Sequence, residues 1–302
     1  MSERIFSELI RKRWAESKFV CVGLDTDLKN PKFPETAIKD SSEKTIFSFN
    51  QAIIDATCET VCAYKPNVAF YDRLGWEGRM ALVRTVVYIN DRAPGVPVIG
   101  DFKRGDIGNT NLGYVDEAFE VFGFDAVTLH PWLGGEALQP FLDREDKGFF
   151  ILCRTSNPGA GEFQDLYTLT FNPNEQPVGV SDEAFLQRIK QESMQLYQRN
   201  ARNVVTNWNK NGNCGLVVGA TYPEELAAVR KIVGDDIPIL LPGIGAQGGE
   251  VEPTVKAGKD SKGSAMVINV GRAIIFASSD PNYAEAARQA TIRYHEMINQ
   301  YR

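Results

Sequence analysis

Short runs of apolar residues recur along the chain, and longer segments whose apolar residues have helical spacing separate them. The runs are continuous rather than alternating, which is typical of strands that are buried on both faces of a parallel sheet. Eight such runs occur, at residues 19–25, 63–67, 96–101, 126–130, 149–154, 216–219, 237–241 and 265–270. Helices are predicted after most of them, at residues 42–60, 76–90, 109–122, 135–144, 181–210, 223–233 and 281–301. The pattern therefore predicts an α/β fold in which strands and helices alternate.

Two architectures have this alternation, a closed barrel and an open, doubly wound sheet. The number of strands and the length of 302 residues favour the (β/α)8 TIM barrel. No G-x-G-x-x-G pattern follows the first run, which disfavours an open sheet that binds a dinucleotide. We therefore expect residues 1–302 to form a single domain, with an N-terminal helix within residues 1–18 at the bottom of the barrel. Residues 157–180, rich in Pro, Asn and Gly, are expected to be an insertion after strand five.

Composition and charge argue against several classes of function. The net charge is −6 and no run of five like charges occurs, so binding of nucleic acid by charge neutralisation is not expected. Five cysteines do not indicate a disulfide framework, and two histidines without further ligands nearby do not indicate a metal site. The longest apolar stretches are eight or nine residues and the N-terminus is polar, so neither a membrane span nor a signal peptide is predicted. We expect a cytoplasmic protein.

Polar side chains follow the apolar runs, where a barrel of this kind has its active site. The positions are Asp25, Lys65, Asp101 with Lys103, His130, Ser156, Thr221, Gln247 and Arg272. Any one of them alone is as well explained by exposure to solvent, but the convergence of several in one barrel mouth favours a site. Asp101 and Lys103 are two residues apart, so on an extended strand end both side chains point the same way and Phe102 points toward the helices. The competing interpretation of this segment is a solvated loop with a helix N-cap at Asn109 or Thr110.

The segment D-F-K-R-G-D-I-G-N-T at residues 101–110 resembles the D-x-K-x-x-D-[IV]-x-x-T motif of the orotidine 5′-monophosphate decarboxylases. Further strand ends match the same family in order, namely Gly23–Asp25, Tyr64–Pro66, the loop Pro242–Gly249 and the segment Val270–Ile274. The resemblance extends over residues 19–275. The segment R-T-S-N-P-G at residues 154–159 and the insertion after it resemble the longer bacterial, type 2 branch of the family.

The resemblance implies decarboxylation of orotidine 5′-monophosphate (OMP) to uridine 5′-monophosphate (UMP) without a metal or an organic cofactor. It implies that Lys103 is the proton donor at C6 of the pyrimidine and that Asp101 lies against the departing carboxylate. Lys65 and Asp106 would complete an alternating Lys/Asp array. In the family, the residues that match Asp106 and Thr110 reach into the partner's site, so the resemblance also implies a homodimer with shared active sites.

The resemblance further implies how the rest of the substrate is held. Asp25 would bind the ribose hydroxyls, together with Lys65 and the partner's Thr110, and Ser156 would contact the pyrimidine edge. Gln247, the Gly271 and Arg272 backbone, and the Arg272 side chain would bind the phosphate. The glycine-rich loop around residues 248–249 would close over it, although a plain flexible turn has the same composition.

Two alternatives stay open from the sequence. The first is a magnesium-dependent decarboxylase or aldolase of the same suprafamily that acts on a sugar phosphate, in which an acidic metal ligand replaces Lys65. The second is a barrel without catalytic activity that binds a nucleotide. His130 has no assigned role, and a structural histidine is favoured there over a catalytic one. The assignment requires Lys65 and Lys103 to meet around one buried position, and it fails if they lie on opposite rims or if either amine turns outward to bulk water.

Overall fold

A computed structural model describes residues 4–169, 181, 183–184, 187, 192–245 and 248–302 of the chain. Its main sheet has eight parallel strands in the order β2-β1-β10-β9-β8-β5-β4-β3. The strands are β1 (Val20–Gly23), β2 (Ala63–Lys65), β3 (Ile99–Arg104), β4 (Ala126–Leu129), β5 (Gly148–Arg154), β8 (Cys214–Val218), β9 (Ile239–Pro242) and β10 (Met266–Val270). Each overlaps one of the apolar runs, because side chains buried on both faces leave no polar alternation.

The two ends of this sheet meet, so the sheet is a barrel. The backbone N–H of Tyr64 donates to the Pro97 carbonyl at 3.0 Å, and the N–H of Asp101 donates to the Pro66 carbonyl at 3.0 Å. These bonds join β2 to β3, which lie at opposite ends of the strand order. The prediction of a closed (β/α)8 barrel over an open sheet is confirmed.

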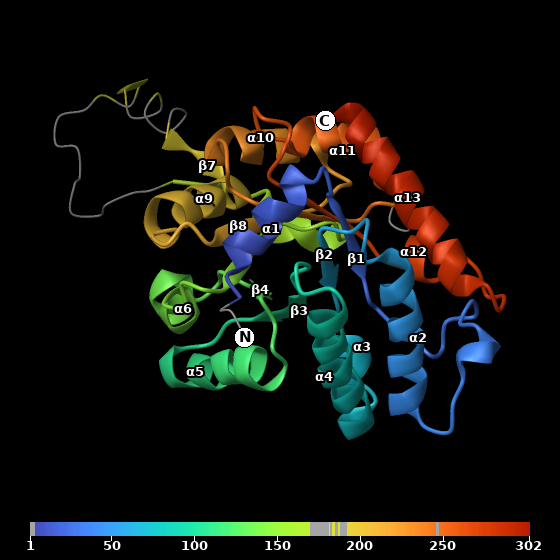
Figure 1. The fold of residues 1–302 in the computed structure, drawn as a ribbon. Helices are drawn as coiled ribbons and strands as arrows, with labels where there is room; N and C mark the ends of the chain where they lie inside the picture. Colours follow the sequence, from blue (N-terminus) through green and yellow to red (C-terminus); the bar gives the residue numbers. More distant parts are fainter. Residues whose placement is uncertain (1–3, 170–180, 182, 185–186, 188–191, 246–247) are drawn as a thin grey trace.

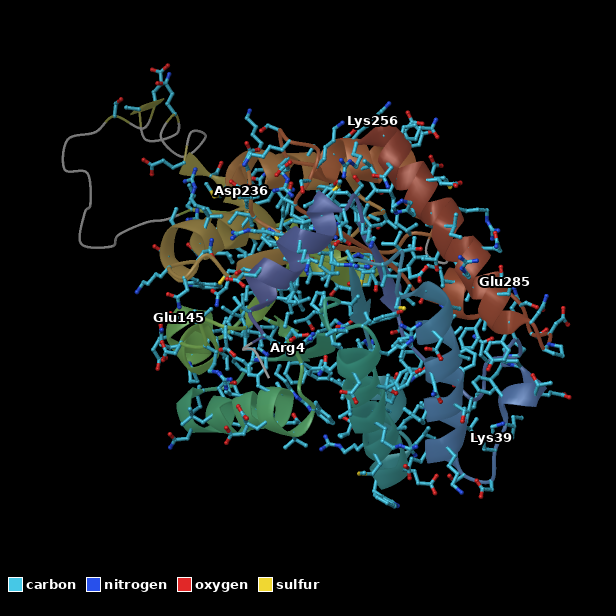
Figure 2. The ribbon with its side chains drawn as sticks, viewed as in Figure 1. Arg4, Lys39, Glu145, Asp236, Lys256 and Glu285 are labelled. Carbon is cyan, nitrogen blue, oxygen red and sulfur yellow. The ribbon has the colours of Figure 1, made fainter. Side chains whose placement is uncertain are left out.

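Helices surround the strands (Figure 1). The longer ones are α2 (Ser42–Thr57), α4 (Gly75–Arg92), α5 (Gly108–Asp116), α6 (Gly134–Leu142), α9 (Leu196–Asn203), α10 (Pro223–Val233), α11 (Val251–Gly258) and α13 (Tyr283–Tyr301). Short helices are α3 (Val68–Asp72), α7 (Gly161–Gln164) and α12 (Arg272–Ile275). Figure 2 shows charged side chains at the outer surface, such as Lys256 on α11 and Glu285 on α13. None of the helices in the described residues is both long and apolar enough to cross a membrane.

The N-terminal helix α1 (Phe6–Ala15) lies across the amino ends of the strands, as predicted. The Phe6 N–H donates to the Asp146 carbonyl at 2.9 Å, just before β5. The Trp14 indole N–H donates to the Met266 carbonyl at 2.8 Å, at the start of β10. The Arg13 guanidinium donates to the carbonyls of Cys58 and Val61, just before β2.

Two predicted elements differ from the structure. Within the range 181–210 expected to be one helix, the described residues 183–184, 187 and 192 are helical, but the strand β7 (Met194–Gln195) then precedes α9 and a π-helical segment over Val204–Trp208. β7 pairs antiparallel with β6 (Tyr167–Thr168), a part of the predicted insertion, in a small ribbon. Conversely, α11 lies where only a glycine-rich loop was expected. Its Pro253 is in the first turn, where a missing N–H costs no helical hydrogen bond, so the proline does not prevent the helix.

Candidate active site

A cavity of about 440 Å³ opens at the carboxyl ends of the strands. Seven of the ten predicted site residues line it together, namely Asp25, Lys65, Asp101, Lys103, Ser156, Gly271 and Arg272. The lining also includes Thr155, Asn157, Pro242, Gly243 and Ile244, which belong to segments that the sequence had matched to the family. The lining residues that the sequence did not suggest are Asn67, Thr128, Leu152, Gln164, Val217, Leu240 and Asn269. Gln247 lies outside the described residues, and the cavity lining does not include Asp106 or Thr110.

Asp101 joins the two lysines at the floor of this cavity. The Lys65 ammonium, at the end of β2, lies 2.6 Å from Asp101 Oδ2, and the Lys103 ammonium pairs with Asp101 Oδ1. The side chain of Lys65 is only 3% exposed and that of Asp101 is 11% exposed, whereas Lys103 is half-exposed toward the cavity. The two ammonium groups therefore meet at one carboxylate, and they do not lie on opposite rims.

Burial and the neighbouring charges have opposite effects on the pKa values of Asp101 and Lys65. Burial favours the neutral acid of Asp101, but the charges of Lys65 and Lys103 outweigh it and hold the pKa of Asp101 well below its ordinary value. Burial likewise favours the neutral amine of Lys65, but the carboxylates of Asp101 and Asp25 hold the pKa of Lys65 above its ordinary value. Asp101 and Lys65 are therefore both charged at neutral pH.

The backbone that carries Lys103 is not an extended strand, contrary to the sequence prediction. Lys103 has a φ of +49°, and the register of β3 against β4 shifts between Gly100 and Arg104. The Thr128 hydroxyl of β4 accepts a hydrogen bond from the Lys103 N–H at 3.0 Å and donates one to Asp101 Oδ1 at 3.1 Å. A lone hydroxyl inside the apolar run 126–130 is the signal that could have identified Thr128. Phe102 packs on Phe124, and the cavity lining does not include it.

Asp25 follows β1 and presents a buried acceptor. Among the described residues, its Oδ1 atom has no hydrogen-bond partner. Burial raises the pKa of Asp25, and the neighbouring Lys65 only partly offsets this effect. A buried carboxylate oxygen without a donor is costly, so a ligand hydroxyl that donates to Asp25 would be stabilised here.

A glycine-rich loop and the start of α12 form the opposite side of the cavity. Gly243, Gly245 and Gly248 have φ values of +110°, +77° and +86°, which favour glycine. The Gly249 N–H donates to the Gly243 carbonyl at 3.1 Å and folds the loop back on itself. Exposed Arg272 lines the cavity beside this loop, so its guanidinium is accessible to an anion.

The segment after β5 is held against the cavity by buried polar contacts. The Arg154 guanidinium lies 2.9 Å from the Asp165 carboxylate and stacks on the Tyr222 ring at 4.1 Å. Gln164 accepts the Thr155 N–H at 2.8 Å and donates to the Thr155 hydroxyl at 3.0 Å. These contacts fix the chain on both sides of Ser156, which lines the cavity between them.

The sequence profile of the orotidine 5′-phosphate decarboxylase / HUMPS family matches residues 18–290. The chain belongs to this family. It is 42% identical over 297 residues to orotidine 5′-phosphate decarboxylase from Janthinobacterium sp. (strain Marseille), covering 98% of both chains. It is 44% identical over 298 residues to the protein of the same name from Cupriavidus metallidurans, again covering 98% of both chains. The structure of Leishmania donovani OMP decarboxylase matches with a TM-score of 0.77 and 33% identity, over 98% of both chains. The family resemblance carried by the segment 101–110 is thus confirmed.

Asp106 and Thr110, the two family positions expected to act across a dimer, lie at the rim. The Asp106 carboxylate accepts the Ile107 N–H at 2.7 Å, and the Asn111 side chain accepts the Asp106 N–H at 2.9 Å. Thr110 is exposed at the start of α5. Ile107, which follows Asp106 in the chain, is also exposed. Within the described part of one chain, the cavity therefore brings together Lys65, Asp101 and Lys103, but not Asp106.

His130 lies beside this site. It lines a neighbouring cavity with Trp132 and Trp208, and its Nδ1 accepts the Trp132 N–H at 3.3 Å. Gly105 approaches the imidazole so closely that a Cβ atom there would lie 2.8 Å from Nε2. These contacts assign His130 a packing position in the described chain.

Proposed function

We propose that the protein decarboxylates OMP to UMP without a metal or an organic cofactor, with Lys103 as the proton donor. The observation that carries this proposal is the placement of one buried carboxylate, Asp101, between two ammonium groups at the floor of the cavity. Membership of the family and the names of the relatives supply the substrate class. The geometry of Lys65, Asp101 and Lys103 supports the roles that the resemblance implies for these residues.

The reaction breaks the bond between C6 and the carboxyl group, and its electron pair stays on C6 while CO₂ departs. Little delocalisation stabilises this carbanion, so a fixed positive charge beside C6 lowers the barrier most directly. The Lys103 ammonium would supply that charge and then transfer a proton from Nζ to C6. Asp101 would lie against the substrate carboxylate, and this repulsion decreases once the charge has moved to the ring. The neutral amine of Lys103 regains its proton from solvent.

The remainder of the cavity would bind the ribose, the phosphate and the pyrimidine edge of the nucleotide. The buried Oδ1 of Asp25 would accept a hydrogen bond from a ribose hydroxyl. Arg272 and the backbone at Gly271 would bind the phosphate together with the glycine-rich loop. Gln247 would contribute an amide there, and Ser156 would meet the pyrimidine edge.

We also propose that two copies of the chain share their active sites. The partner's Asp106 would complete the Lys/Asp array, and the partner's Thr110 would reach the ribose. The exposed positions of Thr110 and Ile107 support this proposal, because a second copy can approach them without rearrangement of the barrel.

The donor set argues against the metal-dependent alternative. A divalent cation needs carboxylate oxygens that are free to coordinate it. Asp101 instead accepts from two ammonium groups and a hydroxyl, and the charge of Lys65 would repel a cation. The second alternative, a barrel without catalytic activity, requires the same site to bind a nucleotide and leave it unchanged.

Turnover of OMP, compared with and without a chelator, and binding of UMP together separate the cofactor-free decarboxylase, the metal enzyme and the inactive barrel. Turnover is followed at neutral pH by the ultraviolet absorbance of OMP. Loss of absorbance is expected for the wild type, and Lys103→Ala is expected to abolish nearly all turnover while UMP still binds. Lys44→Ala, which removes an exposed lysine paired with Asp40, is the matched control and should keep full activity. Activity that the chelator removes would indicate the metal enzyme, and binding without turnover would indicate the inactive barrel.

A further inference from the structure

The backbone of Lys103 has a conformation that lysine rarely adopts. Its φ of +49° is in the left-handed region, which side chains with a Cβ avoid. The two strands pair at Gly100↔Val127 and again at Arg104↔Leu129. From the first pair to the second, β3 advances four residues but β4 advances only two. Asp101, Phe102 and Lys103 therefore form a bulge, a feature that re-aims side chains beside active sites.

One side chain of the neighbouring strand lies opposite this bulge. Thr128 is between Val127 and Leu129 in the sequence of β4 and is only 1% exposed. Its hydroxyl accepts from the Lys103 backbone N–H at 3.0 Å and donates to Asp101 Oδ1 at 3.1 Å. Asp101 Oδ1 is the same atom that pairs with the Lys103 ammonium. The hydroxyl thus links the backbone of Lys103 to the carboxylate that holds its side chain.

We infer that Thr128 is a positioning residue for the proton donor, an inference that rests on the proposed function. The hydroxyl replaces the strand partner that the bulge removes from the Lys103 N–H, and it fixes which way the Asp101 carboxylate faces. A β-branched side chain suits this task because its χ1 angle is restricted. Without the hydroxyl, the left-handed conformation loses its support, and the bulge can relax in a way that moves the ammonium away from its place beside C6.

The test compares Thr128→Val, which keeps the shape and removes the hydroxyl, with Thr128→Ser, which keeps the hydroxyl. For Thr128→Val, kcat with OMP is expected to fall by about 10- to 100-fold, as for loss of a hydrogen bond to a charged group. KM and the Kd for UMP should change little, because the ribose and phosphate contacts are elsewhere. Thr128→Ser should restore most of kcat.

Thr291→Val is the matched control for the loss of a buried hydroxyl. Thr291 is fully buried on α13, and its hydroxyl donates to the Ala287 carbonyl at 2.8 Å. This variant is expected to lose stability without losing kcat. If Thr128→Val does not fold, Thr128→Cys takes its place, since a thiol fills similar space and is only a weak donor.

A crystal structure of the folded variant provides a reading that does not depend on activity. In Thr128→Val, we expect Lys103 to leave the left-handed region and its ammonium to leave Asp101. An unchanged kcat, a serine variant as impaired as the valine variant, or an unchanged Lys103 backbone would each overturn the inference. A wild-type protein that does not decarboxylate OMP would refute the proposed function instead, and the crystal structure would still decide whether Thr128 holds Lys103.

Discussion

Replacement of Asp101 by asparagine should destabilise the protein more than any other single change of charge in the cavity. The side chain keeps its shape, but Lys65, whose side chain is 3% exposed, loses the carboxylate 2.6 Å away. Removal of one partner from a buried ion pair costs about 3–5 kcal/mol, because the remaining buried charge loses its direct partner; here Lys65 keeps only the weaker influence of Asp25. A domain is typically stable by about 5–15 kcal/mol, so Asp101→Asn removes a large part of the margin.

The chain offers a matched control for this substitution. Asp40 and Lys44 form a similarly close pair, 2.8 Å apart, but their side chains are 71% and 58% exposed. Solvent screens such a pair, so Asp40→Asn is expected to change the free energy of unfolding little. The difference between the two variants therefore measures the effect of burial, since both lose the same charge.

Urea denaturation at a fixed protein concentration gives the free energy of unfolding for each variant. Because the pKa of Asp101 is lowered in the folded state, its contribution is complete above the unfolded pKa of about 3.9 and disappears as the pH falls through the folded value. The gap between wild type and Asp101→Asn should thus be constant from about pH 5 to 8 and should narrow below about pH 4. A gap no larger than that of Asp40→Asn, or one that does not narrow in acid, would refute the reasoning.

Three further predictions concern the substrate. Arg272→Ala should lower kcat/KM for OMP by about 100-fold or more, because the guanidinium binds the phosphate. The kcat/KM for the nucleoside orotidine, which has no phosphate, should change little, and equal losses for both would remove Arg272 from the phosphate site. A 1:1 mixture of Asp101→Ala and Asp106→Ala proteins should regain about a quarter of the wild-type rate, since half of the dimers then contain one intact shared site; no recovery in confirmed heterodimers would indicate sites within one chain. Asp25→Asn should weaken UMP binding by about 10-fold and leave binding of 2′,3′-dideoxyuridine 5′-monophosphate unchanged. Since burial raises the pKa of Asp25, UMP binding to the wild type should also weaken as the pH falls through a value above 3.8, as calorimetric titration would show.

The apolar runs predicted the barrel well because its strands are buried on both faces. That burial makes the hydrophobic pattern continuous, so each run marks a strand regardless of the helices around it. The cavity residues followed from the same property, because the carboxyl ends of parallel strands converge at one end of a barrel. Asp25 and Arg272 lie just after β1 and β10, and Lys65 is the last residue of β2. These strands are neighbours in the sheet, although the chain separates them widely.

Features that depend on the pairing of particular strands could not be predicted in this way. The direction of the Lys103 side chain depends on the register shift between β3 and β4 and on the hydroxyl of Thr128. No local pattern in residues 99–104 indicates the register shift or the contact with Thr128. The contacts of Gln164 with Thr155 likewise join the residue after β5 to an insertion that has no hydrophobic period, nine positions further along the chain. Local periodicity therefore located the site, and tertiary pairing set its geometry.

At the amino end of the barrel, opposite the cavity, a buried charged side chain is stabilised by hydrogen bonds within the protein. Near the amino ends of β9 and β10, the buried Arg230 guanidinium donates to four carbonyls, those of Gly234, Ile237, Gly258 and Ala265, at 2.8–3.0 Å. Burial lowers the pKa of Arg230 to about 10, which leaves it charged at neutral pH. Here a buried charge makes four hydrogen bonds and joins two helix ends to two strands. At the carboxyl ends, by contrast, the buried Oδ1 atom of Asp25 has no donor among the described residues. A buried acceptor without a donor is costly, so the amino end holds a buried charge that the protein itself satisfies, whereas the carboxyl end holds an acceptor that a ligand hydroxyl could satisfy.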